Sequence, residues 1–393
     1  MSPGQSKVVE PGGLLAILGG GQLGRMTAMA ARTMGYRVRV MDPEGACPAS
    51  FVVDEVVTGK WDDVEAARQL ATGADAVTLE IEQIGVDALR EVAALAPLRP
   101  GVEPIRIIQD KILQKTWLAA QGFPVGAFRV VRSEAELQDA VPALGGRVFV
   151  KIARGGYDGR GQARLGLDGE ATEAAIRDGW ASLGGRPAVA EQALDLDFEI
   201  SVMAARSPSG EVRSYPAARN HHEQQILAWS VLPAGIPKEL ERRAQEIARQ
   251  IIAGLDLEGL LCVEMFVTIS GELLVNELAP RPHNSYHQSE RACVTSQFEQ
   301  LVRTTCNLPL GDTEILTPAA IVNLLGDTWL DQPSGQAPNF AAALTVPGVR
   351  LHLYEKHAAR AGRKMGHLSA TGASAEEAQA RVLEAKARLS NPS

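Results

Sequence analysis

Apolar runs alternate with amphipathic stretches along the N-terminal part of the chain. Strands are predicted over Leu14–Leu18 and residues 37–41, 51–57 and 75–79, and helices from Gln22 onward and over residues 62–71. Alternation of this kind is typical of a parallel sheet covered by helices. We therefore expect an N-terminal Rossmann-like domain over residues 12–107, preceded by a disordered tail over residues 1–11.

The rest of the chain mixes helices with longer strands. A helix is predicted over residues 109–121, and strands over residues 125–131 and 147–153 enclose a helix over residues 133–140. This α+β stretch is expected to form a compact lid over residues 123–192, within a central domain over residues 108–310. A further helix is predicted over residues 237–254. A C-terminal β-rich domain is expected over residues 311–393, in which a polar loop over residues 331–336 precedes a short β-rich segment and a final helix over residues 374–389.

A hairpin over residues 259–281 carries two facing carboxylates. If Ser270 and Gly271 are the central turn residues, Ile269 pairs with Glu272, and counting outward places Glu264 opposite Glu277. Opposed like charges destabilise a sheet unless a cation compensates them, and ligation by oxygens alone points to Mg²⁺. Asn276 adds a third oxygen only if the strand bends. The competing interpretation is a solvated hairpin face with two unrelated glutamates.

Composition narrows the class of protein. The chain has 393 residues, a formal net charge of −8 and 22% charged residues, which argues against nucleic-acid binding. The four cysteines form no CxxC pair, and neither a leader nor an apolar run long enough to span a membrane is visible. We therefore expect a cytoplasmic protein that acts on small molecules.

The segment Gly19-Gly20-Gly21-Gln22-Leu23-Gly24 matches GxGxxG between the first strand and its helix, and Asp42 ends the second strand. Alone it suggests a nicotinamide dehydrogenase. The same glycines suit any phosphate at a helix N-terminus, and no downstream segment suggests hydride transfer. A purely structural turn remains the third interpretation.

A second glycine-rich loop follows Lys151, which lies on an apolar strand, and extends over residues 155–162. Glycines let backbone amides approach phosphates closely, and a buried lysine needs an anion. No GxxxxGK[ST] motif occurs, so this is not a Walker A loop. The alternative is a surface turn with a lysine whose stem is buried and whose head reaches water.

Three further segments carry candidate binding groups. The segment 191–194 is suited to a purine edge and Glu199 to ribose hydroxyls, although a plain connecting strand would look the same. The turn 280–285 presents Arg281, His283 and Asn284, donors suited to bicarbonate or a carboxylate. A cluster with Lys356, Arg363 and Lys364 suits a substrate phosphate, or is a solvated charge run.

Together these segments resemble the ATP-grasp enzymes, and most closely the 5-(carboxyamino)imidazole ribonucleotide synthases of purine biosynthesis. The resemblance runs from about Leu14 to His367 and rests on four motifs in family order: residues 20–26, 155–162, 276–285 and 362–367. It implies an ATP-grasp fold, α/β and α+β, and ATP- and bicarbonate-dependent carboxylation of 5-aminoimidazole ribonucleotide through carboxyphosphate. It also implies a homodimer.

The resemblance assigns roles to individual residues. It implies that Glu264 and Glu277 hold Mg²⁺ and that Arg281, His283 and Asn284 bind bicarbonate. The ribonucleotide would contact Gln22, Leu23, Glu80, Tyr157, Asp158, Lys356, Arg363 and Lys364. ATP would contact Lys111, Lys151, Gly155, Gly156, Tyr157, Asp158, Gly159, Arg160, Gly161, Gln162, Glu191, Gln192, Ala193, Leu194, Glu199, His222 and Asn276.

The chain departs from the family pattern after Ser285, where it reads Tyr286-His287-Gln288 in place of Gly-His-Tyr and adds bulk near the expected bicarbonate pocket. Lys111 stands where arginine is frequent, and the residues after His222 also differ. Three rival functions stay open: a formate-dependent glycinamide ribonucleotide transformylase, a nicotinamide oxidoreductase, and an inactive nucleotide-binding subunit. The presence of both Glu264 and Glu277 argues against the last.

Overall fold

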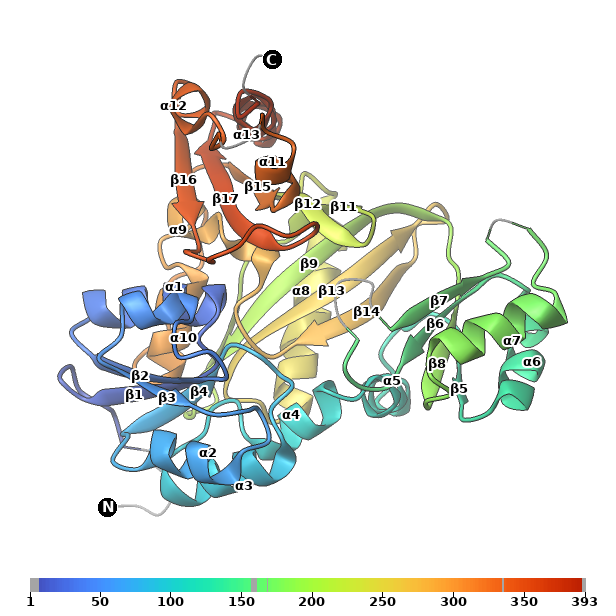
Figure 1. Ribbon diagram of the computed structural model, residues 1–393, viewed down its shortest axis with the longest axis horizontal. Coiled ribbons are helices and arrows are strands. Elements are labelled where there is room, and N and C mark those ends of the chain that lie inside the picture. Colours follow the sequence, from blue (N-terminus) through green and yellow to red (C-terminus); the bar gives the residue numbers. More distant parts are fainter. Residues whose placement is uncertain (1–6, 157–160, 168, 334–335, 391–393) are drawn as a thin grey trace.

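The computed structural model describes residues 7–156, 161–167, 169–333 and 336–390. Figure 1 shows three bodies around a long central sheet: the N-terminal unit (blue), the lid (green) and the C-terminal unit (red). Among the described residues, no helix has the length and apolar character needed to cross a membrane.

The N-terminal unit is a parallel sheet with helices on both faces, as predicted. Its strand order is β3-β2-β1-β4, all parallel. One face packs on α2 and α3 and the other on α1. The expected strand over residues 51–57 starts later, because a 3₁₀ turn occupies its first residue. The elements are β1 (Leu14–Leu18), α1 (Gln22–Thr33), β2 (Arg37–Asp42), η1 (Pro48–Phe51), β3 (Glu55–Thr58), α2 (Val64–Ala71), β4 (Ala76–Leu79), α3 (Val86–Leu95) and α4 (Val102–Ile108).

The segment before β1 is partly ordered, so the expected tail over residues 1–11 is too long. Val9 is buried, its N–H donates to the carbonyl of Cys306 at 2.9 Å, and its carbonyl accepts from the Tyr36 hydroxyl at 2.7 Å. Residues 1–6 lie outside the described part of the chain.

The lid is a four-stranded antiparallel sheet with its own apolar core under two helices. Its strand order is β5-β8-β6-β7. The chain enters it beside the central hairpin, where Val125 forms a parallel bridge with Val275. The elements are α5 (Lys111–Ala120), which precedes the lid, β5 (Phe128–Val131), α6 (Glu134–Ala143), β6 (Val148–Ile152), β7 (Gln162–Leu165), α7 (Glu173–Ser182) and β8 (Ala188–Gln192).

The central sheet continues into the C-terminal unit. Its order is β14-β13-β9-β11-β12-β15-β17-β16, with β10 beside β9, and α8 packs against β9 and β13. The strands are β9 (Leu196–Arg206), β10 (Val212–Ser214), β11 (Ala218–Glu223), β12 (Ile226–Leu232), β13 (Gly259–Thr268), β14 (Leu273–Ala279), β15 (Ala319–Leu325), β16 (Val349–Leu353) and β17 (Lys364–Thr371). The helices are α8 (Lys238–Gly254), η2 (Asn284–Tyr286), α9 (Ser289–Ala292), α10 (Gln297–Thr305), α11 (Asp327–Leu330), α12 (Phe340–Ala343) and α13 (Ala375–Ala387).

Candidate active site

The two hairpin carboxylates face each other as predicted, but by a different route. Glu264 pairs with Glu277, whereas next to the turn Val267 pairs with Leu273, one residue out of the expected register. The predicted two-residue turn is therefore wrong. The register changes between Glu264 and Met265, where Asn276 is an extra residue on β14. This β-bulge supplies the bend that a third oxygen requires, because a bulge redirects the side chains beside it.

Each carboxylate contacts a cationic side chain from another element. Lys111 Nζ lies 2.5 Å from Glu277 Oε1, and His283 Nε2 lies 3.0 Å from Glu264 Oε1. Burial raises the pKa of Glu264, but His283 outweighs it and lowers this pKa to about 2. Burial lowers the pKa of His283, but the Cys262 thiol and Glu264 raise it to about 10. The repulsion predicted between the two glutamates is thus offset inside the protein.

The residues present fit a Mg²⁺ ion. Asn276 Oδ1 is buried without a hydrogen-bond partner, beside two carboxylates. Within the described ranges, no group of three or more His, Cys, Asp or Glu side chains is arranged to hold a metal. Mg²⁺ usually binds one or two carboxylates and completes its octahedral shell with water and substrate phosphates, so Glu264, Glu277 and the Asn276 oxygen are suited to it.

Lysines gather around Glu191 at the end of β8. Lys151 Nζ on β6 lies 3.1 Å from Glu191 Oε2, and Lys115 Nζ on α5 lies 3.5 Å from the same atom. Lys111 begins α5, so it is one helical turn before Lys115. Burial lowers the pKa of Lys115. Together with Glu277, the cluster has three lysines to two glutamates, an excess of positive charge that favours a polyanionic ligand.

The predicted nucleotide segment is close to these lysines. Glu199 Oε2 lies 2.9 Å from His222 Nδ1 on the adjacent strand β11. The N–H groups of Gln192 and Ala193 donate to the carbonyls of Ala127 and Arg147. Those two amides are therefore engaged within the lid, and a purine edge would need other groups of the 191–194 segment.

The turn after β14 holds an arginine and an asparagine with different environments. Arg281 makes a two-pronged ion pair with Glu82, with nitrogen–oxygen distances of 2.5 and 3.2 Å. Burial raises the pKa of Glu82, but Arg281 outweighs it and lowers this pKa. Asn284 is buried, yet neither atom of its amide has a hydrogen-bond partner. A buried unpaired amide is costly, so Asn284 is suited to a polar ligand.

The GxGxxG loop contains its own anion. Glu80 Oε1 accepts from Gly21 N at 2.6 Å, and Oε2 accepts from Gly24 N at 2.8 Å. Asp42 accepts from Gly20 N at 2.9 Å. Carboxylates from the ends of β2 and β4 thus occupy the position at the N-terminus of α1 that a dinucleotide phosphate would need. This geometry disfavours the nicotinamide hypothesis.

Part of the C-terminal basic cluster reaches α1. Lys356 Nζ donates to Gln22 Oε1 at 2.6 Å, which joins two residues assigned to the ribonucleotide. Leu23 is instead a core residue, packed with Met26, Phe298 and Tyr354. Arg363 donates to the carbonyl of Ala358 at 3.0 Å, and Lys364 begins β17. Tyr157, Asp158, Gly159 and Arg160 lie outside the described residues.

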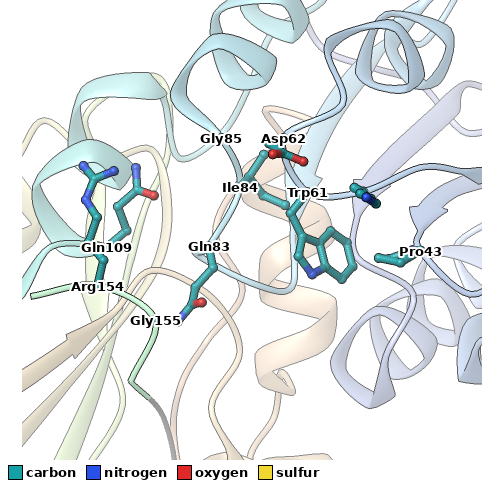
Figure 2. Close-up of a pocket in the computed structure, with 10 residues that line it drawn as sticks. Pro43, Trp61, Asp62, Gln83, Ile84, Gly85, Gln109, Arg154 and Gly155 are labelled. Carbon is teal, nitrogen blue, oxygen red and sulfur yellow. The ribbon is translucent and has the colours of Figure 1, made fainter. Parts of the chain in front are cut away.

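A cavity of about 500 Å³ adjoins the site. Figure 2 shows Trp61 and Pro43 of the N-terminal unit on one side and Arg154 and Gly155, where the second glycine-rich loop begins, on the other. Gln83, next to Glu82, also lines it. The cavity therefore lies between the N-terminal unit and the base of the lid.

Tyr286 and Gln288 do not crowd the expected bicarbonate pocket. The Tyr286 hydroxyl donates to the carbonyls of Ser201 or Pro216, each at 2.8 Å, and its ring packs on Tyr215 in the core. Gln288 is fully buried and donates to the carbonyl of Ser285 at 2.7 Å. Both departures from the family pattern are therefore fully buried side chains with hydrogen-bond partners inside the protein.

Two residues of the site were missed in the sequence. Glu82 follows the end of β4 by three residues, a position where parallel sheets place functional side chains, so its signal was present. Lys115 was identifiable from its spacing of four residues from Lys111, which puts both side chains on one helix face.

Three family models match the chain in order. They are the ribonucleotide synthetase preATP-grasp domain at residues 14–109, the ATP-grasp domain at residues 116–298, and the phosphoribosylaminoimidazole carboxylase C-terminal domain at residues 319–381. Fold and site together therefore place the chain in the ATP-grasp class.

Relatives that match nearly the whole length of the chain identify the family within the ATP-grasp class. The N5-carboxyaminoimidazole ribonucleotide synthase of Bacillus subtilis is 39% identical, with 92% of each chain covered. The crystal structure of the Staphylococcus aureus synthetase with ADP has a TM-score of 0.89 at 32% identity, covering 98% of this chain and all of that one. The Aspergillus clavatus synthase with ADP and 5-aminoimidazole ribonucleotide has a TM-score of 0.85 at 33% identity, covering 96% and 99%. The chain belongs to the N5-carboxyaminoimidazole ribonucleotide synthase family.

Proposed function

We propose that this protein carboxylates 5-aminoimidazole ribonucleotide at its exocyclic amine, using ATP and bicarbonate and releasing ADP and phosphate. The observation that carries the proposal is the pairing of Glu264 with Glu277 beside the unpartnered Asn276 and close to lysines that hold excess positive charge. Such a set suits phosphoryl transfer, which depends on positioning and charge neutralisation rather than on a protein nucleophile.

ATP is proposed to bind between the lid and the central sheet. Lys111 and Lys151 would exchange their glutamate contacts in part for phosphate oxygens, and Glu199 would bind the ribose with His222 behind it. Glu264, Glu277 and Asn276 would hold Mg²⁺. When bound, this ion would neutralise charge that develops on the transferred phosphoryl group.

Bicarbonate is proposed to bind at the turn after β14. Asn284 offers an unpartnered amide, His283 a ring that is 14% exposed, and Arg281 a guanidinium that Glu82 fixes in orientation. Attack of bicarbonate on the γ-phosphate would give carboxyphosphate, which releases carbon dioxide for capture by the substrate amine. A buried site protects such a labile intermediate from water.

The ribonucleotide is proposed to bind between α1 and the C-terminal unit. Lys356, with Gln22 in contact, would hold its phosphate together with Arg363 and Lys364. Glu80, at the N-terminus of α1, would face its ribose or amine. Leu23 would contribute only packing, because its side chain belongs to the core.

We further propose the domain division given by the sequence, namely residues 12–107, 108–310 with a lid over about 123–192, and 311–393. A homodimer in the cytoplasm is also proposed. Four buried free cysteines among the described residues support a reducing compartment.

ADP release by the purified protein tests the function. With Mg²⁺ and ATP present, bicarbonate and 5-aminoimidazole ribonucleotide are added separately and together, and strong stimulation by the pair is expected. If only formate with another amine stimulates ADP release, the proposed substrates are wrong. Glu277→Gln is expected to abolish ADP formation in a folded protein, and near-normal turnover would refute the metal assignment.

A further inference from the structure

Both ring nitrogens of His283 are held by other side chains. Nε2 faces Glu264 Oε1 at 3.0 Å, and Nδ1 lies 2.8 Å from the Ser285 hydroxyl. The backbone is held as well, because His283 N donates to Gln297 Oε1 at 2.8 Å and its carbonyl accepts from Gln297 Nε2 at 3.0 Å. The ring is therefore oriented by Glu264 and by Ser285, whose backbone N–H also donates to Nδ1 at a longer distance of 3.4 Å.

Ser285 belongs to a closed, buried cluster of polar groups from β9, β11 and β12, because its own carbonyl also accepts from the Ser230 hydroxyl at 3.0 Å. Its hydroxyl lies 2.7 Å from that of Ser201 on β9, which accepts from Asn220 Nδ2 on β11 at 3.0 Å. Asn220 Oδ1 accepts from the Ser230 hydroxyl on β12 at 2.9 Å. The three serines are fully buried and Asn220 is 5% exposed.

Polar groups buried this deeply are not needed for packing. Replacing both partners of a buried hydrogen bond by apolar groups of similar shape is often nearly neutral, so a core of this size does not require hydroxyls at these positions. One member of the cluster, Ser285, contacts His283, which in turn contacts the proposed metal ligand Glu264. These buried polar groups therefore lie next to residues that take part in the proposed reaction.

A hydroxyl is suited to this task. The Ser285 hydroxyl can bond to Nδ1 and to the Ser201 hydroxyl at the same time, because a hydroxyl both donates and accepts. The position of the ring is therefore tied to β9. Catalytic groups lose much of their effect when they are displaced by about 1 Å.

We propose that Ser285 and Ser201 are positioning residues that fix the His283 ring between Glu264 and the bicarbonate pocket. The proposal rests on the role of His283 given under Proposed function. The two serines do not touch substrate in this arrangement, and they act through the orientation of the ring.

Steady-state kinetics of three variants tests the proposal. Ser285→Ala is expected to lower kcat for carboxylation at least tenfold, with KM for ATP within twofold of that of the unchanged protein. Ser201→Ala is expected to act in the same direction more weakly. Ser285→Thr, which keeps the hydroxyl, is expected to recover most of the lost kcat. Circular dichroism shows whether each variant folds. If Ser285→Ala does not fold, the kcat of Ser201→Ala tests the proposal, and an unchanged kcat in that variant overturns it.

The matched control is Ser207→Ala, just beyond the other end of β9. Ser207 is 2% exposed, and its hydroxyl lies 2.7 Å from that of the exposed Ser209, so the variant removes a buried serine hydroxyl and its contact away from the site. It should leave kcat unchanged. A folded Ser285→Ala protein with normal kcat, alongside an inactive His283→Ala protein, overturns the inference and leaves the proposed function standing. Normal kcat of His283→Ala removes His283 from the bicarbonate site and overturns the inference as well. The proposed function is overturned separately, if bicarbonate and 5-aminoimidazole ribonucleotide together fail to stimulate ADP release by the unchanged protein.

Discussion

At the scale of single residues, several of the buried atoms that lack a hydrogen-bond partner lie in the proposed site. Asn276 Oδ1, both amide atoms of Asn284 and Glu191 Oε1 are buried and unpaired, although buried polar groups in proteins are nearly always satisfied. They lie on β14, after β14 and on β8, the elements that the proposed ATP, metal and bicarbonate sites use. The molecule therefore carries unpaired acceptors and donors where three ligands are proposed.

Replacement of Asn276 tests the third oxygen of the proposed Mg²⁺ site. Asn276→Ala should raise the Mg²⁺ concentration for half-maximal ADP release about tenfold or more, because one ligand is lost while both carboxylates remain. Asn276→Asp keeps an oxygen ligand and should not raise it. The measurement is a Mg²⁺ titration at saturating ATP, and an unchanged midpoint in the alanine variant would exclude Asn276 as a ligand.

Lys115 is expected to matter for nucleotide binding more than for stability. Lys115→Met removes one of the two lysines on Glu191 and should raise KM for ATP about tenfold, since the excess positive charge disappears. The free energy of unfolding should change by no more than about 1 kcal/mol, because burial of the charge was itself costly. Lys238→Met, at an exposed position, is the control. An unchanged KM would remove Lys115 from the site.

At the scale of elements, the hairpin shows how far a sequence pattern can be trusted. The count from Ser270 and Gly271 gave the correct opposition of Glu264 and Glu277, because a longer turn and a β-bulge shift the register in opposite directions. Apolar alternation determines the strands, but a bulge depends on neighbouring elements, here on Val125, which pairs with Val275. No local signal in the sequence specifies that contact.

The lid contains a glycine whose replacement should be costly. Gly166 has a φ of 71°, and a Cβ there would lie within van der Waals overlap of the carbonyl oxygen of Gly146. Gly210 also has a positive φ, of 88°, but a Cβ there would have no other atom within 4 Å. Gly210→Ala should therefore lower the free energy of unfolding by about 1 kcal/mol, because alanine is less stable than glycine at a positive φ. Gly166→Ala should lower it by about 2 kcal/mol more, because of the added clash. Denaturant unfolding measures both, and equal costs would contradict the predicted clash.

At the scale of the whole molecule, the sequence predicted the order of the bodies but not their joining. The N-terminal parallel sheet, the lid and the late hairpin follow from local patterns. The continuous sheet from β14 to β16 does not, because the pairing of β12 with β15 brings together residues far apart in the chain. The stack of His287, His367 and His352, with ring centroids 4.8 and 4.5 Å apart, is likewise formed only by that joining.

Glu290, near this stack, should make stability depend on pH. Burial raises its pKa to about 7, although Arg350 and Arg291 oppose the rise, and His352 lies 4.0 Å away. The folded state therefore binds more protons than the unfolded state above the usual glutamate pKa of 4.5. The contribution of Glu290 to stability should fall as the pH rises from about 4.5 to about 7 and then level off.

Glu290→Gln isolates this contribution, since it removes the charge and nearly keeps the shape. The variant should be more stable than the unchanged protein at about pH 8, and the difference should shrink towards about pH 5. Thermal unfolding at both pH values measures it. A difference that is independent of pH would show that Glu290 titrates normally.

The Glu80 carboxylate on the amides of Gly21 and Gly24 has a consequence for metabolism. A tethered group competes at a high effective concentration, so free dinucleotides are poor rivals for the same amides. NADH fluorescence should accordingly show no binding. The GxGxxG loop therefore does not respond to the ratio of NADH to NAD in the cell. We expect the rate at which carboxylated ribonucleotide is made to stay the same when that ratio changes.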